Sequence, residues 1–337
     1  MPRADASACA PGAALALGGN TTGSSRQSLL ARASGSIWAL VDNEYRNQLP
    51  VQGGDENSVE WQRLVPFFLL HLGCLGAIWT GVGWFAALVC VALYALRMFA
   101  ITAVYHRYLS HRSYDAPRWL VFLGSWTAAA AAQRGPLWWA AHHRKHHRHS
   151  DREGDAHSPL HGRFWWSHVG WFTTRSNFRT DLQQLPDLRE HAELRWLDRF
   201  DIVAPMSLLI ALYVLGEVLA VNAPSLETSG WQLVVWGFCV STTLVFHVTS
   251  MVNSVCHLFG SRPWNTSDQS RNLPWLALLT FGEGWHNNHH YCPGSVRQGF
   301  RWWQLDFSFY VLWVMERIGL VKLRPLPARA RADGNAA

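Results

Sequence analysis

The chain has 337 residues, of which 49% are hydrophobic and only 15% charged, with 20 tryptophans, and this balance indicates a membrane protein rather than a soluble enzyme of the same length. The formal net charge of +6 fits an anionic lipid surface, an acidic carrier or a nucleic acid, and composition alone does not choose among them. The six cysteines are scattered without a C-x-x-C pair, which excludes a disulfide framework and a thiolate metal site from the prediction.

The first segment is rich in Ala, Gly and Ser and poor in large apolar side chains, so we expect residues 1–45 to be disordered. The run Ala8 to Leu17 faintly resembles a signal-peptide core, but Pro11 and Gly12 interrupt it and we do not expect cleavage. We assign residues 46–320 to one membrane domain and residues 321–337 to a Pro/Ala/Arg tail.

Four apolar runs organise the membrane domain, and they cover residues 64–80, 85–104, 202–221 and 231–255. Each is near the roughly 20 residues that a helix needs to cross the hydrocarbon core. The alternative, four buried helices of a soluble bundle, seldom has runs this long with so few charges. The sequence therefore predicts an all-α integral membrane protein with four transmembrane helices in two hairpins.

Loop charges predict the orientation. The short connections Gly81 to Trp84 and Asn222 to Gly230 contain no Lys or Arg, whereas the regions after the second and fourth spans contain many. The positive-inside rule places those basic regions, and both termini, in the cytoplasm. We expect a cytosolic helical cap from residues 106–200 and 257–320, with the protein in the inner membrane if its source is bacterial. The run Trp119 to Ala132 is too short to span and is expected at the interface.

Nine of the 17 histidines fall in clusters, and two spans separate the second cluster from the third, so all clusters are expected on one side of the membrane. The clustered histidines are His106, His111, His143, His146, His147, His257, His286, His289 and His290. Five others, which stand alone in the sequence, are interpreted as structural or surface residues: His71, His161, His168, His191 and His247. Near the second cluster, His142, His149 and His157 are expected to contact ligand rings or solvent.

The spacing within the clusters suits shared ligation. Positions i, i+3 and i+4 share one side of a helix, which describes the trios that begin at His143 and at His286. Asn253 and His257 are also i, i+4. His106 and His111 are i, i+5, about 140° apart on an ideal helix, so the helix must unwind or end between them if both bind one centre.

Neutral imidazole binds zinc, copper, iron and nickel. Nine histidines exceed the needs of one four-coordinate zinc and suggest two metals of higher coordination number, with iron the better choice for redox chemistry with O2. The alternative for the stretch "HHRKHHRH" is a solvated basic face or a lipid-headgroup patch.

The segments "HRYLSHRSY", "HRKHHRHSD", "NSVCHLFG" and "GEGWHNNHH", with "DREGDAHSP" and "SHVGWF", resemble the histidine boxes of membrane fatty-acid desaturases. The resemblance runs from about residue 60 to 320 and is strongest to the acyl-CoA delta-9 (stearoyl-CoA type) branch and its bacterial relatives. It implies a mushroom-shaped, four-span protein with two non-haem irons. It also implies that the nine clustered histidines are iron ligands, with Asn253 joining through a water. The implied reaction inserts a cis double bond, at delta-9, into a saturated acyl chain and consumes O2 and two electrons.

Such chemistry needs a narrow apolar channel beside the metals, because an unactivated methylene offers nothing to an acid, base or nucleophile. Candidate channel residues are Trp126, Trp138, Trp139 and Trp285. Candidate partners for the phosphates of the acyl carrier are Arg134, Arg144, Lys145, Arg163 and Arg175. Carboxylates that could orient ligating rings are Asp151, Asp155 and Glu283.

Two departures from the animal members bear on the carrier. Ala141 and His142 stand where those members have Arg-Asp, and Ser176 stands where a Lys commonly follows Arg175. We expect acyl-CoA, with acyl-lipid or acyl carrier protein as alternatives. No fused cytochrome b5 domain is recognisable, so we expect a separate electron donor of the ferredoxin, rubredoxin or cytochrome b5 type, the surrounding lipid as a further partner, and no nucleic acid.

Other functions remain open at this point. A diiron hydroxylase or ketolase acting on a lipid or hydrocarbon would share the ligand set. A non-enzymatic metal transporter or sensor would place its ligands near the bilayer midplane rather than at span ends. A zinc protease is disfavoured because no H-E-x-x-H occurs.

Overall fold

The computed structural model describes residues 38–48 and 57–325, and these residues are mostly helical. Four helical segments in them are long and apolar enough to cross a membrane, as the sequence predicts: Arg63–Thr80, Trp84–Ser110, Val203–Asn222 and Gly230–Ser254. The first comprises most of α3 (Trp61–Cys74) and all of α4 (Ala77–Thr80), and the third is α10 (Val203–Asn222). The second joins α5 (Trp84–Ala100) to the π-helix η1 (Ile101–Ser110), and the fourth joins α11 (Gly230–Leu233), the π-helix η6 (Val234–Val240) and α12 (Ser241–Ser254).

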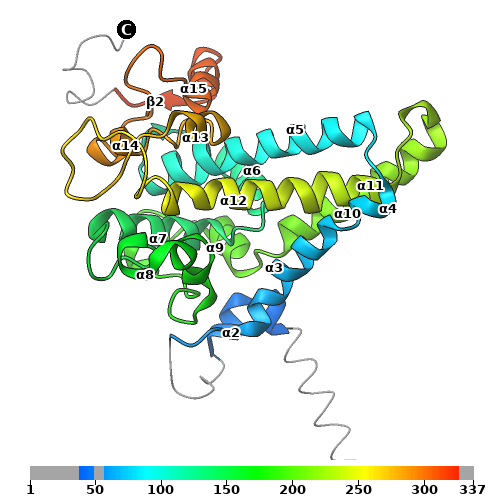
Figure 1. Cartoon of the computed structure of the whole chain (residues 1–337), viewed down its shortest axis with the longest axis horizontal. Helices are drawn as coiled ribbons and strands as arrows, with labels where there is room; N and C mark the ends of the chain where they lie inside the picture. Colours follow the sequence, from blue (N-terminus) through cyan, green and yellow to red (C-terminus); the bar gives the residue numbers. More distant parts are fainter. Residues whose placement is uncertain (1–37, 49–56, 326–337) are drawn as a thin grey trace, which may run out of the picture.

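These helices lie side by side (Figure 1). Many of their large apolar side chains are exposed, as a lipid-facing bundle requires. Ile78 and Trp79 are 75% and 80% exposed. The inner faces pack closely where side chains are small. A Cβ added at Gly73 would lie 2.6 Å from Cys239 Sγ, so this glycine lets α3 approach η6.

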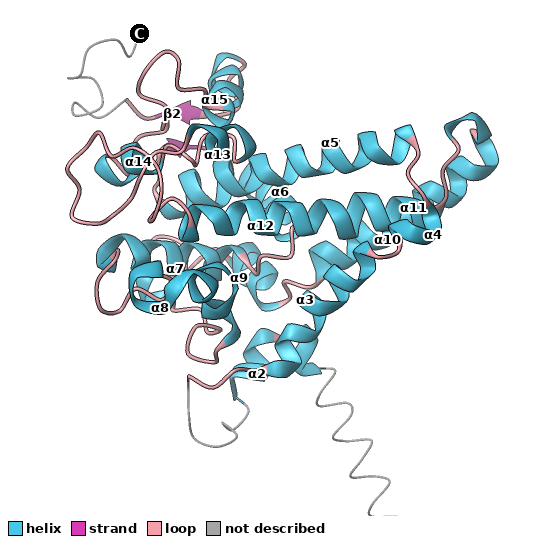
Figure 2. Ribbon diagram, viewed as in Figure 1, coloured by secondary structure: helices cyan, strands magenta, loops and turns pink. Residues whose placement is uncertain are grey.

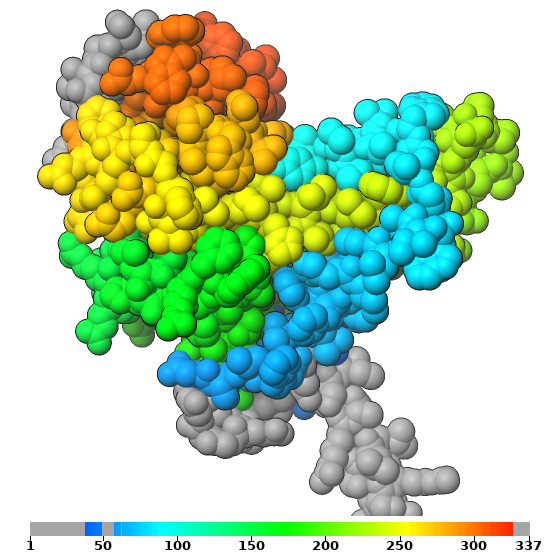
Figure 3. Space-filling view, in the orientation of Figure 1, coloured from blue at the N-terminus to red at the C-terminus, as the bar shows by residue number. Residues whose placement is uncertain are grey.

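The remaining elements gather at one end of the bundle, away from α4 and α11 (Figures 1 and 2). They are α6 (Arg118–Ala129), α7 (Pro136–His149), α8 (Pro159–Trp165), η2 (Trp166–Gly170), η3 (Trp171–Thr173), η4 (Leu182–Gln184), α9 (Ala192–Arg199), α13 (Pro274–Leu279), α14 (His286–Tyr291) and α15 (Phe307–Arg317). The short helix η5 (Pro224–Leu226) lies at the opposite end, between α10 and α11. The space-filling view shows this end as a broad head on a narrower body (Figure 3). The apolar residues of this head and of the adjoining ends of α5 and α12 form one buried cluster.

A buried arginine lies inside the second span. Arg97 is 1% exposed, and its guanidinium and Nε atoms donate to Leu93 O, Ala130 O, Gly237 O and the hydroxyls of Ser241 and Thr242. The cation is therefore held by backbone and hydroxyl oxygens from α5, η6, α12 and the end of α6. This satisfies the requirement that a charge at this depth faces protein rather than lipid.

The structure moves two predicted boundaries. Most of the expected disordered segment lies outside the described residues, but residues 38–45 were assigned to it wrongly, because Asn43–Gln48 form α2 and Asp42 pairs with Arg199 at 2.6 Å. The predicted tail began too early, since Lys322–Leu323 (β2) pair antiparallel with Tyr114–Asp115 (β1). In both places the partner is distant in the sequence, so local composition gives no sign of it. The rest of the tail, from residue 326, lies outside the described residues.

Candidate metal centre

The first pair of histidines lies at the end of the second span. The helix changes there from α to π, with backbone bonds from i+5 to i, and His111 N donates to His106 O at 3.2 Å. Residues five apart are one turn apart in a π-helix, so both rings lie on the same side. The unwinding that the i, i+5 spacing required therefore takes the form of a π-helix that ends at Ser110.

The second trio lies on α7. Pro136 begins this helix, and Asp198 Oδ1 from α9 accepts a hydrogen bond from the backbone N of Trp138 at 2.7 Å, which caps one of the free N–H groups of the first turn. His143, His146 and His147 follow at i, i+3 and i+4 and come from one side of the helix.

The third trio lies on α14, which follows a tight turn. Gly282 has φ +125°, and a Cβ there would lie 2.5 Å from Asp306 Oδ1 and 2.8 Å from Arg107 Nη2. Only glycine fits this close approach. The turn delivers His286, His289 and His290 into the interior of the head.

The nine histidines converge in two adjoining groups. One consists of His106, His111, His143, His147 and His289, and the other of His146, His257, His286 and His290; within each group the candidate ligand atoms lie within 4.8 Å of one another. The trios are shared between the groups, because α7 and α14 each contribute to both. The shared helices place the two groups side by side.

The spacing of the ring nitrogens tests whether a metal fits. The Nε2 atoms of His106 and His289, of His111 and His143, and of His257 and His286 lie 3.0, 2.8 and 3.0 Å apart. An ion about 2.1 Å from each nitrogen places neighbours about 3.0 Å apart at right angles and about 3.4 Å apart in a tetrahedron. The distances thus fit ligands of a metal with more than four ligands. In addition, His290 Nε2 is buried and has no hydrogen-bond partner among the described residues, as expected for a ligand atom.

Carboxylates contact the opposite nitrogen of four of these rings. Glu283, Asp155 and Asp151 lie 2.6, 3.1 and 2.8 Å from Nδ1 of His106, His146 and His257. A carboxylate at Nδ1 fixes the proton there and leaves Nε2 free to bind a metal. Arg107, buried between Glu283 and Asp306, holds Glu283 in turn.

The fourth carboxylate, Asp268, was not predicted from the sequence. Asp268 Oδ2 lies 2.7 Å from His290 Nδ1, and Asp268 also accepts from Ser270 and Thr266. It lies in an irregular loop between α12 and α13. The serine and threonine that fix Asp268 are a turn pattern, which does not point to a metal site by itself.

Against the effect of burial, Asp155 raises the pKa of His146, but burial dominates at several other rings. Burial lowers the pKa of His143, His147 and His289 well below the usual range, and the neighbouring rings lower it further. Burial also lowers the pKa of His290 to about 4, although Asp268 acts in the opposite direction. Neutral rings at physiological pH have the free lone pairs that a metal needs.

Two other predicted positions lie beside the groups. Asn253 of α12 lines the same cavity as His146 and His286, one turn before His257. His157 is 5% exposed, with its ring centroid 4.4 Å from that of His146 and its Nδ1 3.7 Å from Asp155. His142 packs on Trp138, with ring centroids 4.6 Å apart, whereas His149 is exposed.

Three histidines that stand alone in the sequence meet in space. His71 Nε2 lies 2.9 Å from His247 Nε2, and His247 Nδ1 lies 3.0 Å from His168 Nε2. They belong to α3, α12 and η2 and join these elements by hydrogen bonds. His161 and His191 are exposed or half-buried, as expected.

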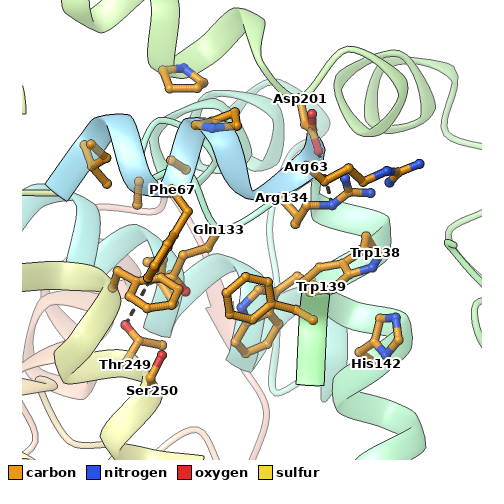
Figure 4. Close-up of a pocket in the computed structure, with 18 of the residues that line it drawn as sticks. Arg63, Phe67, Gln133, Arg134, Trp138, Trp139, His142, Asp201, Thr249 and Ser250 are labelled. Carbon is orange, nitrogen blue, oxygen red and sulfur yellow. Dashed lines mark hydrogen bonds and ion pairs between the residues drawn. The ribbon is translucent and has the colours of Figure 1, made fainter. Parts of the chain in front are cut away.

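A cavity of about 560 Å³ adjoins both groups. Figure 4 shows part of its wall. His106 and His143 of the first group and His146 and His286 of the second line it. Most of the rest of its wall is apolar and comes from α3, α5, η1, α10, η6 and α12, including Leu70, Met98, Ile101, Leu209, Phe238 and Phe246. The volume is that of a small-molecule site, and the wall suits an apolar chain.

Two of the four tryptophans that were predicted to line the channel do so. Trp138 and Trp139 line the cavity, and Trp139 stacks on His143. Trp126 and Trp285 are not among the lining residues. Trp126 stacks on Trp196, and Trp285 is buried with its Nε1 donating to Leu305 O. Aromatic composition identifies interior positions but not the face that an indole presents.

Of the five predicted basic residues, one lines the cavity. Arg134 lines the cavity, whereas Arg144 holds the end of η1 by donating to the carbonyls of Leu109 and Ser110. Arg175 is buried and lies 3.5 Å from Glu60. Lys145 and Arg163 are half-buried and exposed, respectively, and neither lines the cavity.

Comparison with known proteins relates the sequence to a family. Residues 82–319 match the fatty acid desaturase family. The chain is 39% identical over 252 residues to the palmitoyl-monogalactosyldiacylglycerol delta-7 desaturase of Arabidopsis thaliana, a match that covers 74% of this chain and 64% of that protein. It is 38% identical to an acyl-CoA C20 Delta5-desaturase of Anemone leveillei, covering 74% and 77% of the two chains.

A bacterial relative is matched over more of its length. The sn-1 stearoyl-lipid 9-desaturase of Anabaena variabilis is 36% identical over 265 residues, which cover 78% of this chain and 92% of the relative. The chain spans less than two thirds of the length of the Arabidopsis protein but nearly all of the Anabaena protein. The family match contains all nine clustered histidines, and this chain therefore belongs to the fatty acid desaturase family.

Proposed function

We propose that this protein is an O2-dependent fatty acyl desaturase that introduces a cis double bond, at delta-9, into a saturated acyl chain. The reaction removes two hydrogens from adjacent methylenes and reduces O2 to two waters, so two electrons and two protons must come from outside. The observation that carries the proposal is that both histidine groups lie against the same apolar cavity. Family membership supports the same reaction class.

The proposed cofactor is a pair of iron ions. His106, His111, His143, His147 and His289 would hold one, and His146, His257, His286 and His290, with Asn253 through a water, would hold the other. Iron bound there would activate O2, which could then oxidise an unactivated methylene. Asp151, Asp155, Asp268 and Glu283 would keep the rings oriented.

The chain's own residues would position the substrate. Trp139, stacked on His143, and the apolar side chains around it would keep water from the reacting carbons and hold the acyl chain against the metal ligands. Because the cavity continues between the spans, the methyl end of the chain would lie among apolar residues of α3, α10 and η6.

We propose that the four spans form two hairpins and that the head, residues 106–200 and 257–320 within a domain of about 46–320, is cytosolic. The absence of Lys and Arg from the short connections supports this orientation, and it places both termini in the cytoplasm. A bacterial protein of this kind would lie in the inner membrane.

The proposed electron donor is a separate ferredoxin, rubredoxin or cytochrome b5 type protein that meets the cytosolic face, whose basic charge favours an acidic partner.

Lipid analysis of a desaturase-deficient host tests the proposal. Expression of the wild-type chain should produce new monounsaturated acyl chains, and His289→Ala should abolish them. His149→Ala, which removes an exposed histidine outside both groups, is the matched control and should leave the product unchanged. Oxygenated products from the wild-type chain would instead identify a hydroxylase or ketolase.

A further inference from the structure

Two arginines form part of the wall of the acyl cavity. Arg63 comes from α3 and Arg134 from the turn between α6 and α7, and Figure 4 shows both beside Asp201. Their Cζ atoms lie 3.5 and 3.8 Å from the centroid of the Phe178 ring. Two guanidinium groups are thus held close together by a shared aromatic ring, inside a cavity that is otherwise mostly apolar.

Arg63 is buried without a full set of partners. Its side chain is only 5% exposed, and its Nε and Nη1 atoms make no hydrogen bond with the described residues. Its Nε lies 2.9 Å from Glu60 Oε2, but the same oxygen is 2.7 Å from Arg46 Nη2. One carboxylate oxygen is therefore shared between two cations.

Arg134 is better satisfied but is also short of negative charge. Its Nη1 and Nη2 donate to Asn43 Oδ1 and Phe178 O, which are neutral. Its Nε makes no hydrogen bond within the part of the chain that the structure describes, and lies 3.5 Å from Asp201 Oδ2. Among the described residues, Asp201 and a share of Glu60 are thus the anions in contact with these two guanidinium groups. A buried cation with unpaired donors is costly, and an anionic ligand would remove that cost.

We propose that Arg63, together with Arg134, binds a phosphate group of the acyl donor. This inference rests on the proposed function and names the chemistry of its substrate. A guanidinium matches phosphate oxygens with paired N–H groups, and a tetrahedral phosphate presents oxygens in more than one direction, so it can reach both arginines at once. A neutral sugar headgroup would leave both charges uncompensated.

Two kinds of acyl donor carry this group. One is a phospholipid, and the other is a thioester whose carrier has a phosphorylated pantetheine arm. Both present a phosphate beyond the carboxyl end of the acyl chain, joined through glycerol in the phospholipid and through the longer pantetheine arm in the thioester. A galactolipid and a free fatty acid lack it.

Binding to the iron-loaded full-length protein tests the inference with three probes: stearoyl-lysophosphatidylglycerol, stearoyl-CoA and monostearoyl-monogalactosylglycerol. Arg63→Gln should raise the Kd of a phosphate-bearing probe about tenfold or more, because a hydrogen bond to a charged group is lost, and should change the Kd of the galactosyl probe less than about twofold. Arg63→Lys should recover part of the affinity. Arg118→Gln, which removes an exposed arginine paired with Glu193, is the matched control and should have no effect.

A second variant acts in the opposite direction and does not remove the arginine. Asp201→Asn takes away an anion beside Arg134 and should tighten binding of the phosphate-bearing probe. Affinity for either phosphate-bearing probe, with these changes, supports the site, and the one that is desaturated identifies the source of the phosphate. Equal loss for the galactosyl probe, or tighter binding of the galactosyl probe or of free stearate by the wild type, overturns the inference.

The phosphate site and the desaturase function can be tested separately. If the wild type desaturates an acyl donor but Arg63→Gln and Asp201→Asn leave its binding unchanged, the phosphate site is wrong and the desaturase function stands. If the wild type desaturates none of the three probes when a reductant is supplied, the proposed function itself fails.

Discussion

Asp268 Oδ2 lies 2.7 Å from Nδ1 of His290, on the far side of the ring from the Nε2 atom that lacks a hydrogen-bond partner among the described residues. Burial would raise the pKa of Asp268, but the hydrogen bonds from His290 and Ser270 hold it well below its usual range. Asp268 therefore stays ionised, fixes the proton of His290 on Nδ1 and leaves Nε2 free to bind a metal.

The first prediction concerns this contact. Asp268→Asn should weaken iron binding at the second histidine group about tenfold or more, because the ring loses the carboxylate that orients it. Iron retained during titration with a chelator measures the effect. Asp115→Asn, an exposed aspartate that pairs with Arg324, is the control. Equal iron retention by the two variants would count against the role of Asp268.

The site could be predicted from the sequence as far as helical periodicity reaches. The trios on α7 and α14 are visible as i, i+3 and i+4 spacings. Asp268 and Arg63 were missed because contacts between distant parts of the chain place them at the site, and no repeat marks them. Trp126 and Trp285 were expected in the cavity but lie elsewhere, since aromatic content does not specify direction.

The fold, too, could be predicted only in part from the sequence. Hydropathy predicts the four spans because a run of about 20 apolar residues is typical of a transmembrane helix and uncommon elsewhere. It ended the second span at residue 104, since His106 and Arg107 are polar, but the helix continues to Ser110 as a π-helix. Buried partners make this continuation possible: Arg107 pairs with Asp306 at 2.9 Å, and Asp306 is distant in the sequence.

The second prediction concerns Arg97. Arg97→Met should lower the free energy of unfolding by about 3 kcal/mol, because the hydroxyls of Ser241 and Thr242 and the carbonyl of Gly237 lose their donor inside the bundle. Thermal unfolding in detergent measures this loss. Arg324→Met, which removes an exposed ion pair with Asp115, should change stability little. A stable Arg97→Met protein would show that the buried network contributes little.

The third prediction concerns the acyl cavity. Leu70→Trp should shorten the longest acyl chain that is desaturated, because the larger side chain fills space in the cavity wall. Leu72→Trp is the control, since Leu72 is 61% exposed and does not line the cavity. The chain-length distribution of the products in the desaturase-deficient host is the measurement. An identical distribution for the two variants would place the acyl chain elsewhere.

The fourth prediction concerns pH. Burial raises the pKa of Asp198, the cap of α7, to about 6, against hydrogen bonds from Trp138 N and Thr180 that lower it. Because the folded pKa lies above the unfolded value of 3.8, folding takes up a proton as pH falls, and this group stabilises the fold more at pH 5 than at pH 7. The gain is roughly 1 kcal/mol.

Asp198→Asn cannot take up that proton. The difference in unfolding free energy between the wild-type and Asp198→Asn proteins should therefore grow in favour of the wild type as pH falls from 7 to 5. Thermal unfolding of the two proteins across this range measures it, and the comparison cancels the titration of the histidines that both share. A difference that is constant with pH would mean that Asp198 is already ionised throughout the range.

Elemental analysis of protein purified from iron-supplied cells measures how many irons the two histidine groups bind. If the two histidine groups are two iron sites, the wild-type chain should contain about two irons and His289→Ala fewer. A single zinc per chain, or no metal above the level of His289→Ala, would contradict the account.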